Sequence, residues 1–134
     1  MSDKPAITLS SRDFDRLDAL LRGVADEDAH AALRDELERA RVVEPAQLPA
    51  GVVSMNSIVR LADVDNGEEM TLTLVYPREA GKPGTVSIFA PVGSALLGLS
   101  VDQQIDWPLP GNRSRRLRVL AVEYQPEAAG DFHL

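Results

Sequence analysis

Three consecutive acidic residues, Asp26, Glu27 and Asp28, form the densest cluster of candidate ligands or general acids in the sequence. Grouped carboxylates can bind a divalent cation or the basic residues of a partner. These three lie between two segments of helical periodicity, where acidic residues also cap a helix and interact favourably with its dipole. A metal site needs further convergent ligands, and none accompanies them. We interpret the cluster as the solvated tip of a hairpin, with metal binding or catalysis as the alternative.

Other residue types that commonly carry catalysis form no recognisable constellation. The chain has no cysteine, so it can form neither a thiolate nucleophile nor a disulfide. Its two histidines, His30 and His133, lie in different regions. No serine lies in a Gly-x-Ser-x-Gly elbow, and no glycine-rich phosphate loop is present. The sequence favours a binding module over an enzyme and predicts no metal and no cofactor.

The charge balance limits the class of partner. The net charge is −7 and the sequence pI is about 4.7, whereas a nucleic-acid-binding protein usually presents a basic face to phosphates. The one basic cluster, Arg113, Arg115, Arg116 and Arg118, is small. No apolar run approaches the ~20 residues that span a bilayer, and the N-terminal residues lack a secretory pattern. We expect a monomeric, cytoplasmic protein with a protein partner, no membrane and no sequence-specific nucleic-acid binding.

Two amphipathic segments position the acidic cluster. The first predicts a helix that begins at an N-cap, Ser10 or Ser11, and ends at Gly23. The second predicts a helix from about Asp28 to Arg41. Their apolar faces consist of Phe14, Leu17, Leu21 and Val24, and of Ala29, Leu33, Leu37 and Ala40. Helices joined so closely must lie antiparallel, which predicts a short coiled-coil hairpin over residues 1–44 that protrudes as an appendage.

The rest of the chain has the pattern of strands. Residues 45–51, rich in proline and glycine, are the predicted linker, and residues 52–134 the predicted body. Alternating apolar residues on either side of Asn66-Gly67 predict two antiparallel strands joined by a tight turn. Residues 86–89, 105–107 and 117–124 predict further strands, and residues 92–97 a short helix. The expected class is α+β, with four or five antiparallel strands and one short helix.

The C-terminal part carries a family resemblance. The block APVGSALLGLSV at residues 90–101 and the strand VLAVEY at residues 119–124 resemble the C-terminal domain of the Gre transcript-cleavage factors. That domain has a strand, a serine-proline turn, a small-residue helix and a final strand that closes on Glu-Tyr. The first block and the tail EYQPEAAGDF are similar to a branch with a truncated hairpin, the regulators of nucleoside diphosphate kinase. The resemblance covers nearly the whole chain.

The resemblance implies an FKBP-like fold for the body and binding to RNA polymerase at the mouth of its secondary channel, which the hairpin enters. It assigns polymerase contact to Phe89, Ala90 and Pro91, which we name the contact turn. Gre proteins usually have a polar pair before the proline, whereas this chain has Phe89-Ala90. The detailed chemistry of the contact therefore differs from the family pattern.

Hairpin length determines what else the resemblance implies. Helices of about 14 residues extend only ~20 Å at ~1.5 Å per residue, about half the length of a Gre hairpin. We expect the acidic tip to touch basic residues of the channel wall and not to reach the catalytic magnesium. The implied role is a non-catalytic regulator that competes with cleavage factors, and that affects nucleoside diphosphate kinase indirectly. The alternatives are an FKBP-like prolyl isomerase, which would need an aromatic-lined pocket, and an adaptor of a metabolic enzyme.

Overall fold

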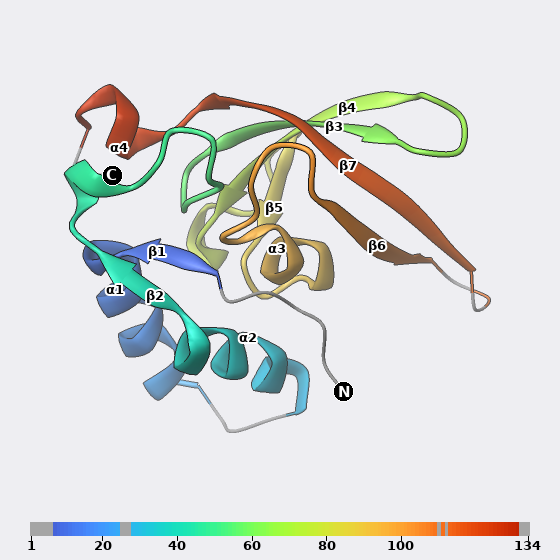
Figure 1. The fold of residues 1–134 in the computed structure, drawn as a ribbon. Coiled ribbons are helices and arrows are strands. Elements are labelled where there is room, and N and C mark those ends of the chain that lie inside the picture. The colour runs from blue at the N-terminus through green and yellow to red at the C-terminus, as the bar shows by residue number, and fades with distance from the viewer. Residues whose placement is uncertain (1–6, 25–27, 110, 112, 132–134) are drawn as a thin grey trace.

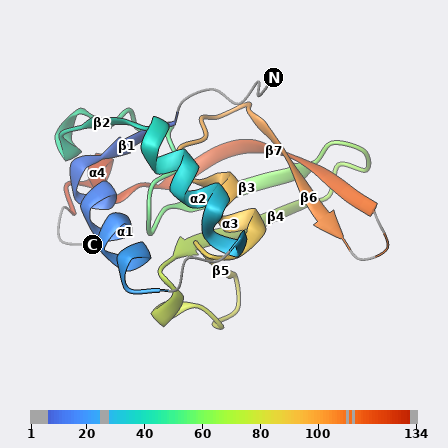
Figure 2. The ribbon, with the colours of Figure 1, turned by 90° about the horizontal axis from the view of Figure 1, so that it is seen from below.

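The computed structural model describes residues 7–24, 28–109, 111 and 113–131 of the 134-residue chain. A helical hairpin lies on one side of a curled five-stranded sheet, and a short helix lies on the same side (Figure 1). Seen from below, the two hairpin helices lie side by side in front of the sheet (Figure 2). This mixed arrangement confirms the predicted α+β class.

The hairpin consists of two helices between two short strands. Its elements are β1 (Thr8–Ser10), α1 (Ser11–Arg22), α2 (Asp28–Arg39) and β2 (Arg41–Val43). The predicted N-cap is confirmed, because the Ser10 Oγ accepts a hydrogen bond from Asp13 N at 3.1 Å. Helix α1 ends at Arg22, immediately before Gly23, as the sequence predicts.

The second helix ends earlier than predicted. Residues 41–43 form β2, which pairs in parallel with β1 in the register Thr8↔Arg41. Arg41 N donates to the Ile7 carbonyl at 2.8 Å, so the two ends of the hairpin are joined at its base. The β-branched Val42 and Val43 fit the extended strand better than another turn of helix.

The hairpin packs against the body, which corrects the expectation that it protrudes. Leu17 and Leu21 of α1 are buried in one apolar cluster with Val53 and Met55 of the body. Burial of this stripe explains why helices of only 12 residues each are stable. The division into a unit of residues 1–44, a linker of residues 45–51 and a unit of residues 52–134 stays a prediction.

The sheet has the strand order β5-β4-β3-β7-β6. Its strands are β3 (Ile58–Asp63), β4 (Glu69–Val75), β5 (Thr85–Ser87), β6 (Gln104–Leu109) and β7 (Arg113–Tyr124). All neighbours are antiparallel except β4 and β5, which pair in parallel. The connection from β4 runs through the short helix η2 (Pro77–Glu79) and returns to the middle of that strand, so β5 runs in the same direction beside Thr73–Val75. The prediction of purely antiparallel strands is wrong at this edge.

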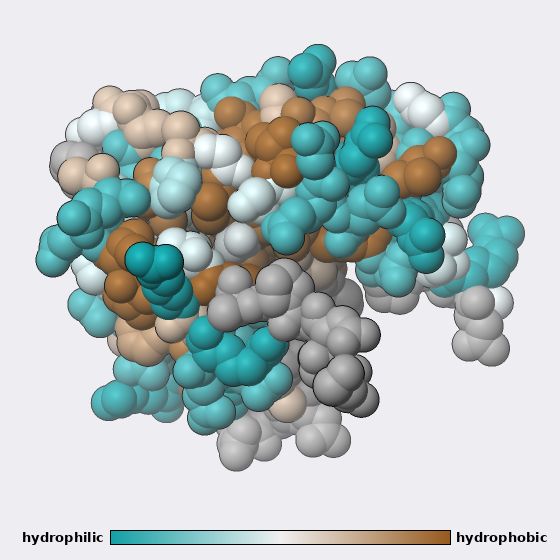
Figure 3. Space-filling model, in the orientation of Figure 1, coloured by the Kyte–Doolittle hydropathy of each residue, from teal (hydrophilic) through white to brown (hydrophobic). Residues whose placement is uncertain are grey.

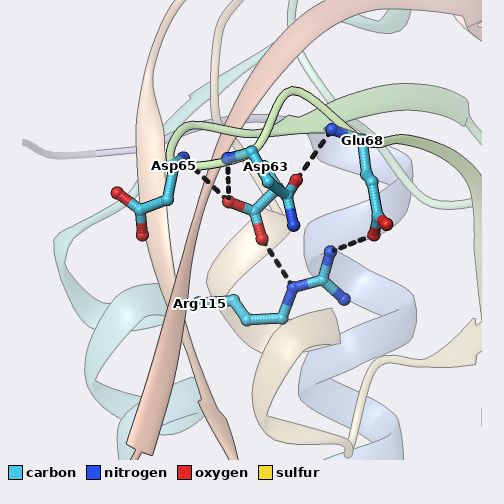
Figure 4. Close-up of polar contacts among 5 residues, drawn as sticks. Asp63, Asp65, Glu68 and Arg115 are labelled. Atoms are coloured by element: carbon cyan, nitrogen blue, oxygen red, sulfur yellow. Dashed lines mark hydrogen bonds and ion pairs between the residues drawn. The ribbon is translucent and has the colours of Figure 1, made fainter.

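The predicted turn between β3 and β4 is confirmed, and a partly buried ion pair between Asp63 and Arg115 attaches it to β7 (Figure 4). Gly67 has φ +77°, a conformation that favours glycine. The Asp63 carboxylate accepts hydrogen bonds from Asp65 N at 2.8 Å and from the Arg115 Nε at 2.7 Å. The Arg115 hydrogen bond is the largest cause that holds the pKa of Asp63 below its usual range.

Three further short helices complete the chain. They are η1 (Pro45–Gln47), α3 (Pro91–Leu96) and α4 (Pro126–Ala129). The predicted helix at residues 92–97 corresponds to α3, shifted by one residue. Helix α4 follows Gln125, whose buried side chain donates to the Pro49 carbonyl at 2.7 Å and to the Val52 carbonyl at 2.6 Å. No helix in the described part of the chain is long and apolar enough to cross a membrane.

Candidate functional site

The contact turn connects the edge strand β5 to helix α3, and one serine organises it. Phe89 N donates to the Ser87 Oγ at 3.1 Å, and Ala90 N donates to the Ser87 carbonyl at 3.0 Å. Ala90 is the N-cap of α3, and its carbonyl accepts from Ser94 N at 3.0 Å. Pro91 is the first helical residue, a position where its fixed φ and missing N–H cost nothing. Hydrogen bonds thus hold the turn to Ser87 of β5 on one side and to the first turn of α3 on the other.

A glycine allows α3 to lie this close to β5. A Cβ built on Gly93 would lie 1.9 Å from the Ser87 carbonyl oxygen and 2.8 Å from its carbon. No real Cβ approaches a backbone atom so closely, so any other residue at position 93 would push the helix from the strand. Ser87 and Gly93 thus determine the geometry of the contact turn, although the sequence prediction named neither as a site residue. The small-residue composition of the helix was the signal that could have found Gly93.

The side chains of the contact turn are half-buried where they are described. Phe89 packs against the main apolar cluster, and Ala90 is also half-buried. The side chain of Pro91 lies outside the described residues. The turn therefore offers a partner a rigid backbone and a small apolar surface.

The predicted hairpin tip is only partly described. Asp26 and Glu27 lie outside the described residues, and Asp28 is described only as the first residue of α2. Each hairpin helix has 12 residues, slightly fewer than predicted. At ~1.5 Å per residue each helix is about 18 Å long.

One buried carboxylate was missed as a site residue. Asp13 is 1% exposed, and its Oδ2 accepts a hydrogen bond from Met55 N of the body at 3.0 Å. Burial is the largest cause that raises the pKa of Asp13 to about 7, although the Met55 hydrogen bond and two nearby arginines, Arg12 and Arg16, oppose it. The negative charge of Glu127 raises it further. No local pattern in the sequence marks Asp13, because its bond to Met55 spans 42 positions of the chain.

The small basic cluster is partly neutralised by acidic neighbours. Arg115 pairs with Asp63, and the Arg116 Nε lies 3.4 Å from a carboxylate oxygen of Asp106. Arg113 and Arg118 are exposed. The expectation that the protein has no sequence-specific nucleic-acid binding stays a prediction.

The described residues form no group that could hold a metal ion, and the cavity beside the hairpin has no aromatic side chain among its described lining. Among the described residues, no three acidic or histidine side chains gather to hold a metal ion. A cavity of about 570 Å³ lies between the hairpin and the α3–β6 region, with Ile7, Glu36, Leu97 and Ile105 in its walls. No aromatic residue is among its described lining, so it differs from the pocket that the isomerase alternative needs.

On the face shown in Figure 3, hydrophilic residues surround several separate hydrophobic areas. The large apolar side chains exposed in the described part of the chain, Val42, Val64 and Val101, belong to different segments. Surface hydropathy alone therefore does not identify the contact turn as a binding site. That assignment depends on the position of the turn in the fold and on its similarity to other proteins.

Comparison with known proteins explains this arrangement of hairpin, braced turn and sheet. Residues 48–124 match the family model described as transcription elongation factor GreA/GreB, C-term. The chain belongs to the GreA/GreB family. A second model, described as Rnk N-terminus, matches residues 5–43 of this GreA/GreB chain. The resemblance inferred from the C-terminal block and the hairpin is confirmed.

Relatives of this GreA/GreB-family chain fall into two groups. The regulator of nucleoside diphosphate kinase of Escherichia coli strain K12 is 44% identical over 138 residues, which cover 98% of each chain. The transcription elongation factor GreA of Thermodesulfovibrio yellowstonii is 33% identical over 94 residues, 69% of this chain and 59% of that protein. These relatives are named as a regulator and an elongation factor.

A solved structure agrees with the fold. The prokaryotic transcription elongation factor GreA/GreB from Nitrosomonas europaea superposes with a TM-score of 0.80 and 45% sequence identity. The match covers 90% of this chain and 100% of that one. The α+β fold described above is thus shared with a GreA/GreB protein.

Proposed function

We propose that this GreA/GreB-family chain is a non-catalytic transcription regulator that binds RNA polymerase near its secondary channel. In this proposal it competes with Gre-type cleavage factors and does not stimulate transcript cleavage. The contact turn, Phe89, Ala90 and Pro91, makes the polymerase contact. The protein acts in the cytoplasm as a monomer and affects nucleoside diphosphate kinase through transcription.

The observation that carries the proposal is the match of residues 48–124 to the C-terminal GreA/GreB model, which includes the whole contact turn. The hydrogen bonds from Phe89 N and Ala90 N to Ser87 support a preorganised contact. A turn that is already ordered loses little conformational entropy when it binds a partner.

The hairpin supports the non-catalytic part of the proposal. Its 12-residue helices give an arm of about 18 Å. If the body binds at the usual place, an arm of this length leaves Asp26, Glu27 and Asp28 far from the catalytic magnesium. In our proposal the tip instead contacts basic residues of the channel wall, where opposite charges favour association.

The test is competition on purified core polymerase. Labelled chain should bind the polymerase, and an excess of a GreA-type factor should displace it. In a backtracked complex the chain should reduce factor-stimulated cleavage and should produce no cleavage when it is added alone. A folded chain that fails to bind polymerase would refute the proposal, and cleavage by the chain alone would refute its non-catalytic part.

Two substitutions test the assigned residues. Ala90→Glu places a charge on the contact turn and should weaken polymerase binding by about tenfold or more. Ala46→Glu, an equally charged change at an exposed position of η1, is the control and should bind as the parent does. Equal binding by all three chains would remove the contact turn from the proposal.

Reversal of the tip charges, Asp26→Lys with Glu27→Lys, should also reduce polymerase affinity, and unchanged affinity would contradict the role of the tip. Adding the purified chain to nucleoside diphosphate kinase should leave the activity of that enzyme unchanged. A direct effect would favour the adaptor alternative instead.

A further inference from the structure

The hairpin is held against the body at a glycine. Gly98 follows helix α3 with φ +80°, and a Cβ built on it would lie 2.4 Å from the Ile7 Cβ and 2.9 Å from the Ile7 Cγ2. Ile7, immediately before β1, is buried. Position 98 therefore requires glycine for two separate reasons, the backbone conformation and the direct packing of Ile7 on its Cα.

Backbone hydrogen bonds make this part of the body stiff. Gly98 N donates to the Val53 carbonyl, and Val53 N donates to the Leu99 carbonyl, both at 2.8 Å. Two residues further on, Met55 N donates to the Asp13 carboxylate of the hairpin at 3.0 Å. We name Val53, Met55 and Gly98 the hairpin seat. Two contacts, Ile7 on Gly98 and Asp13 on Met55, thus add to the buried leucines that hold the hairpin on the body.

The residue that rests on the seat also closes the base of the hairpin. The Ile7 carbonyl accepts from Arg41 N at 2.8 Å, next to the paired strands β1 and β2. If Ile7 moves, both β1 and β2 at the base of the hairpin should therefore move with it.

Helix α3 joins the seat to the contact turn. Its six residues, about 9 Å at ~1.5 Å per residue, separate the two ends. Within the first turn of α3, Gly93 lies against the Ser87 carbonyl, and just beyond the C-terminal end of the helix Gly98 lies against Ile7. Close approaches that require glycine thus occur near both ends of this short element.

We propose that Gly98 is a positioning residue, which through the packing of Ile7 fixes the direction of the hairpin relative to the contact turn. The geometric part concerns this chain alone. Its consequence rests on the proposed function: a polymerase that holds the contact turn meets the hairpin in one orientation. A side chain at position 98 should turn the hairpin away while the contact turn stays intact.

The chain contains no cysteine, so pairs of spin labels can be introduced cleanly. Labels at Ala31→Cys on α2 and Lys82→Cys in the loop before β5, both exposed, report the position of the hairpin relative to the body. Pulsed electron paramagnetic resonance should give one narrow distance distribution for the parent and a shifted or broadened one for Gly98→Ala.

A matched control separates packing from backbone strain. Gly111 also has φ +80°, but a Cβ there meets nothing within 4 Å. Gly111→Ala should therefore leave the distance distribution of the parent unchanged. Adding Ile7→Gly to Gly98→Ala removes the three side-chain atoms that the new methyl group meets, so the double variant should lose the shift caused by the clash and give the distance distribution of Ile7→Gly alone. No shift in Gly98→Ala, or an equal shift in Gly111→Ala, would overturn the positioning role.

If Gly98→Ala does not fold, the single variant Ile7→Gly still tests the seat. It removes the contact without adding a clash, so its distance distribution should broaden relative to the parent. A distribution as narrow as that of the parent would show that the contact with Ile7 does not orient the hairpin.

Photo-crosslinking to polymerase tests the functional consequence. With p-benzoylphenylalanine at position 89, Gly98→Ala should crosslink nearly as well as the parent. With the same group at the exposed position 22, near the end of α1, the crosslinking yield of Gly98→Ala should be about tenfold lower than that of the parent. Equal yields from the parent and Gly98→Ala at both positions, or equal losses at both, would overturn the positioning role. No crosslink from the parent would refute the proposed function, and the resonance distances would still test the geometric part.

Discussion

Asp13 shows how one residue can join two parts of a fold at an energetic cost. Its carboxylate is 1% exposed and accepts a hydrogen bond from Met55 N. A carboxylate in water can accept about four hydrogen bonds, and the bond from Met55 N offsets only part of the hydration that Asp13 loses on burial. Because this hydration is only partly replaced, the pKa of the Asp13 carboxyl rises to about 7.

Removing the charge of Asp13 should flatten the pH dependence of stability. The pKa rises from 3.8 in the unfolded chain to about 7 in the fold, so the folded state binds the proton more tightly. Protonation of Asp13 therefore stabilises the fold fully below about pH 4, and this stabilisation is lost as the pH rises to about 7. The pKa difference sets its upper limit at about 4 kcal/mol of the free energy of unfolding. Asp13→Asn keeps an acceptor for Met55 N but cannot ionise. Urea unfolding at about pH 5 and about pH 8 should therefore show a smaller decrease for Asp13→Asn than for the parent.

The control is Asp15→Asn, an exposed change on the same helix that should behave as the parent does. If Asp13→Asn lost as much stability between the two pH values as the parent, the buried carboxylate would not be the titrating group.

A second prediction at the scale of a residue concerns Gln125. Its amide donates to the carbonyls of Pro49 and Val52, and its side-chain oxygen accepts from Ala128 N at 3.1 Å. Gln125→Ala leaves these groups without their partner and should lower the free energy of unfolding by about 2–3 kcal/mol. Gln47→Ala, at an exposed position nearby in η1, should change it by less than about 0.5 kcal/mol. Thermal and urea unfolding measure both, and equal effects would argue against the role of the Gln125 amide.

At the scale of elements, helix α3 depends on its distance from β5. Gly93→Ala places a methyl group 1.9 Å from the Ser87 carbonyl oxygen and should cost about 1–3 kcal/mol of stability, because the strand or the helix must move. The amide resonances of Phe89 and Ala90, whose N–H groups bond to Ser87, should shift at the same time. Gly23→Ala, where the nearest atom lies at 3.6 Å, should be tolerated. An unchanged stability in Gly93→Ala would mean that α3 does not pack as described.

The elements also show what the sequence could predict. Local signals were sufficient for the N-cap at Ser10, the turn at Gly67 and the position of α3, because each depends on a few neighbouring residues. The contact turn was located through the family pattern. The parallel pairing of β1 with β2 and of β4 with β5 was missed, because the register of a short strand is set by partners distant in the chain. Ser87 and Gly93 were missed because the small residues of the helix show that something approaches it closely but do not show which backbone does.

At the scale of the whole molecule, the hairpin and the sheet share one buried cluster. Leu17, Leu21, Leu33 and Leu37 of the hairpin belong to it, together with Ile88 before the contact turn and Leu96 at the end of α3. The expectation of a protruding appendage failed because an apolar stripe read along one helix does not reveal which surface will cover it. The arm and the body therefore form one packed structure.

The pairing of β1 with β2 has a consequence for how such proteins can diverge. Because residues 8–10 and 41–43 close the arm at its root, inserted turns of helix between α1 and α2 need not disturb the contacts that fix it. Insertion of equal numbers of turns in the two helices would lengthen the arm and leave the grip of the body unchanged. The length of the arm and the surface of the body can then evolve separately, and under the proposed function relatives with arms of different length would compete for one docking place.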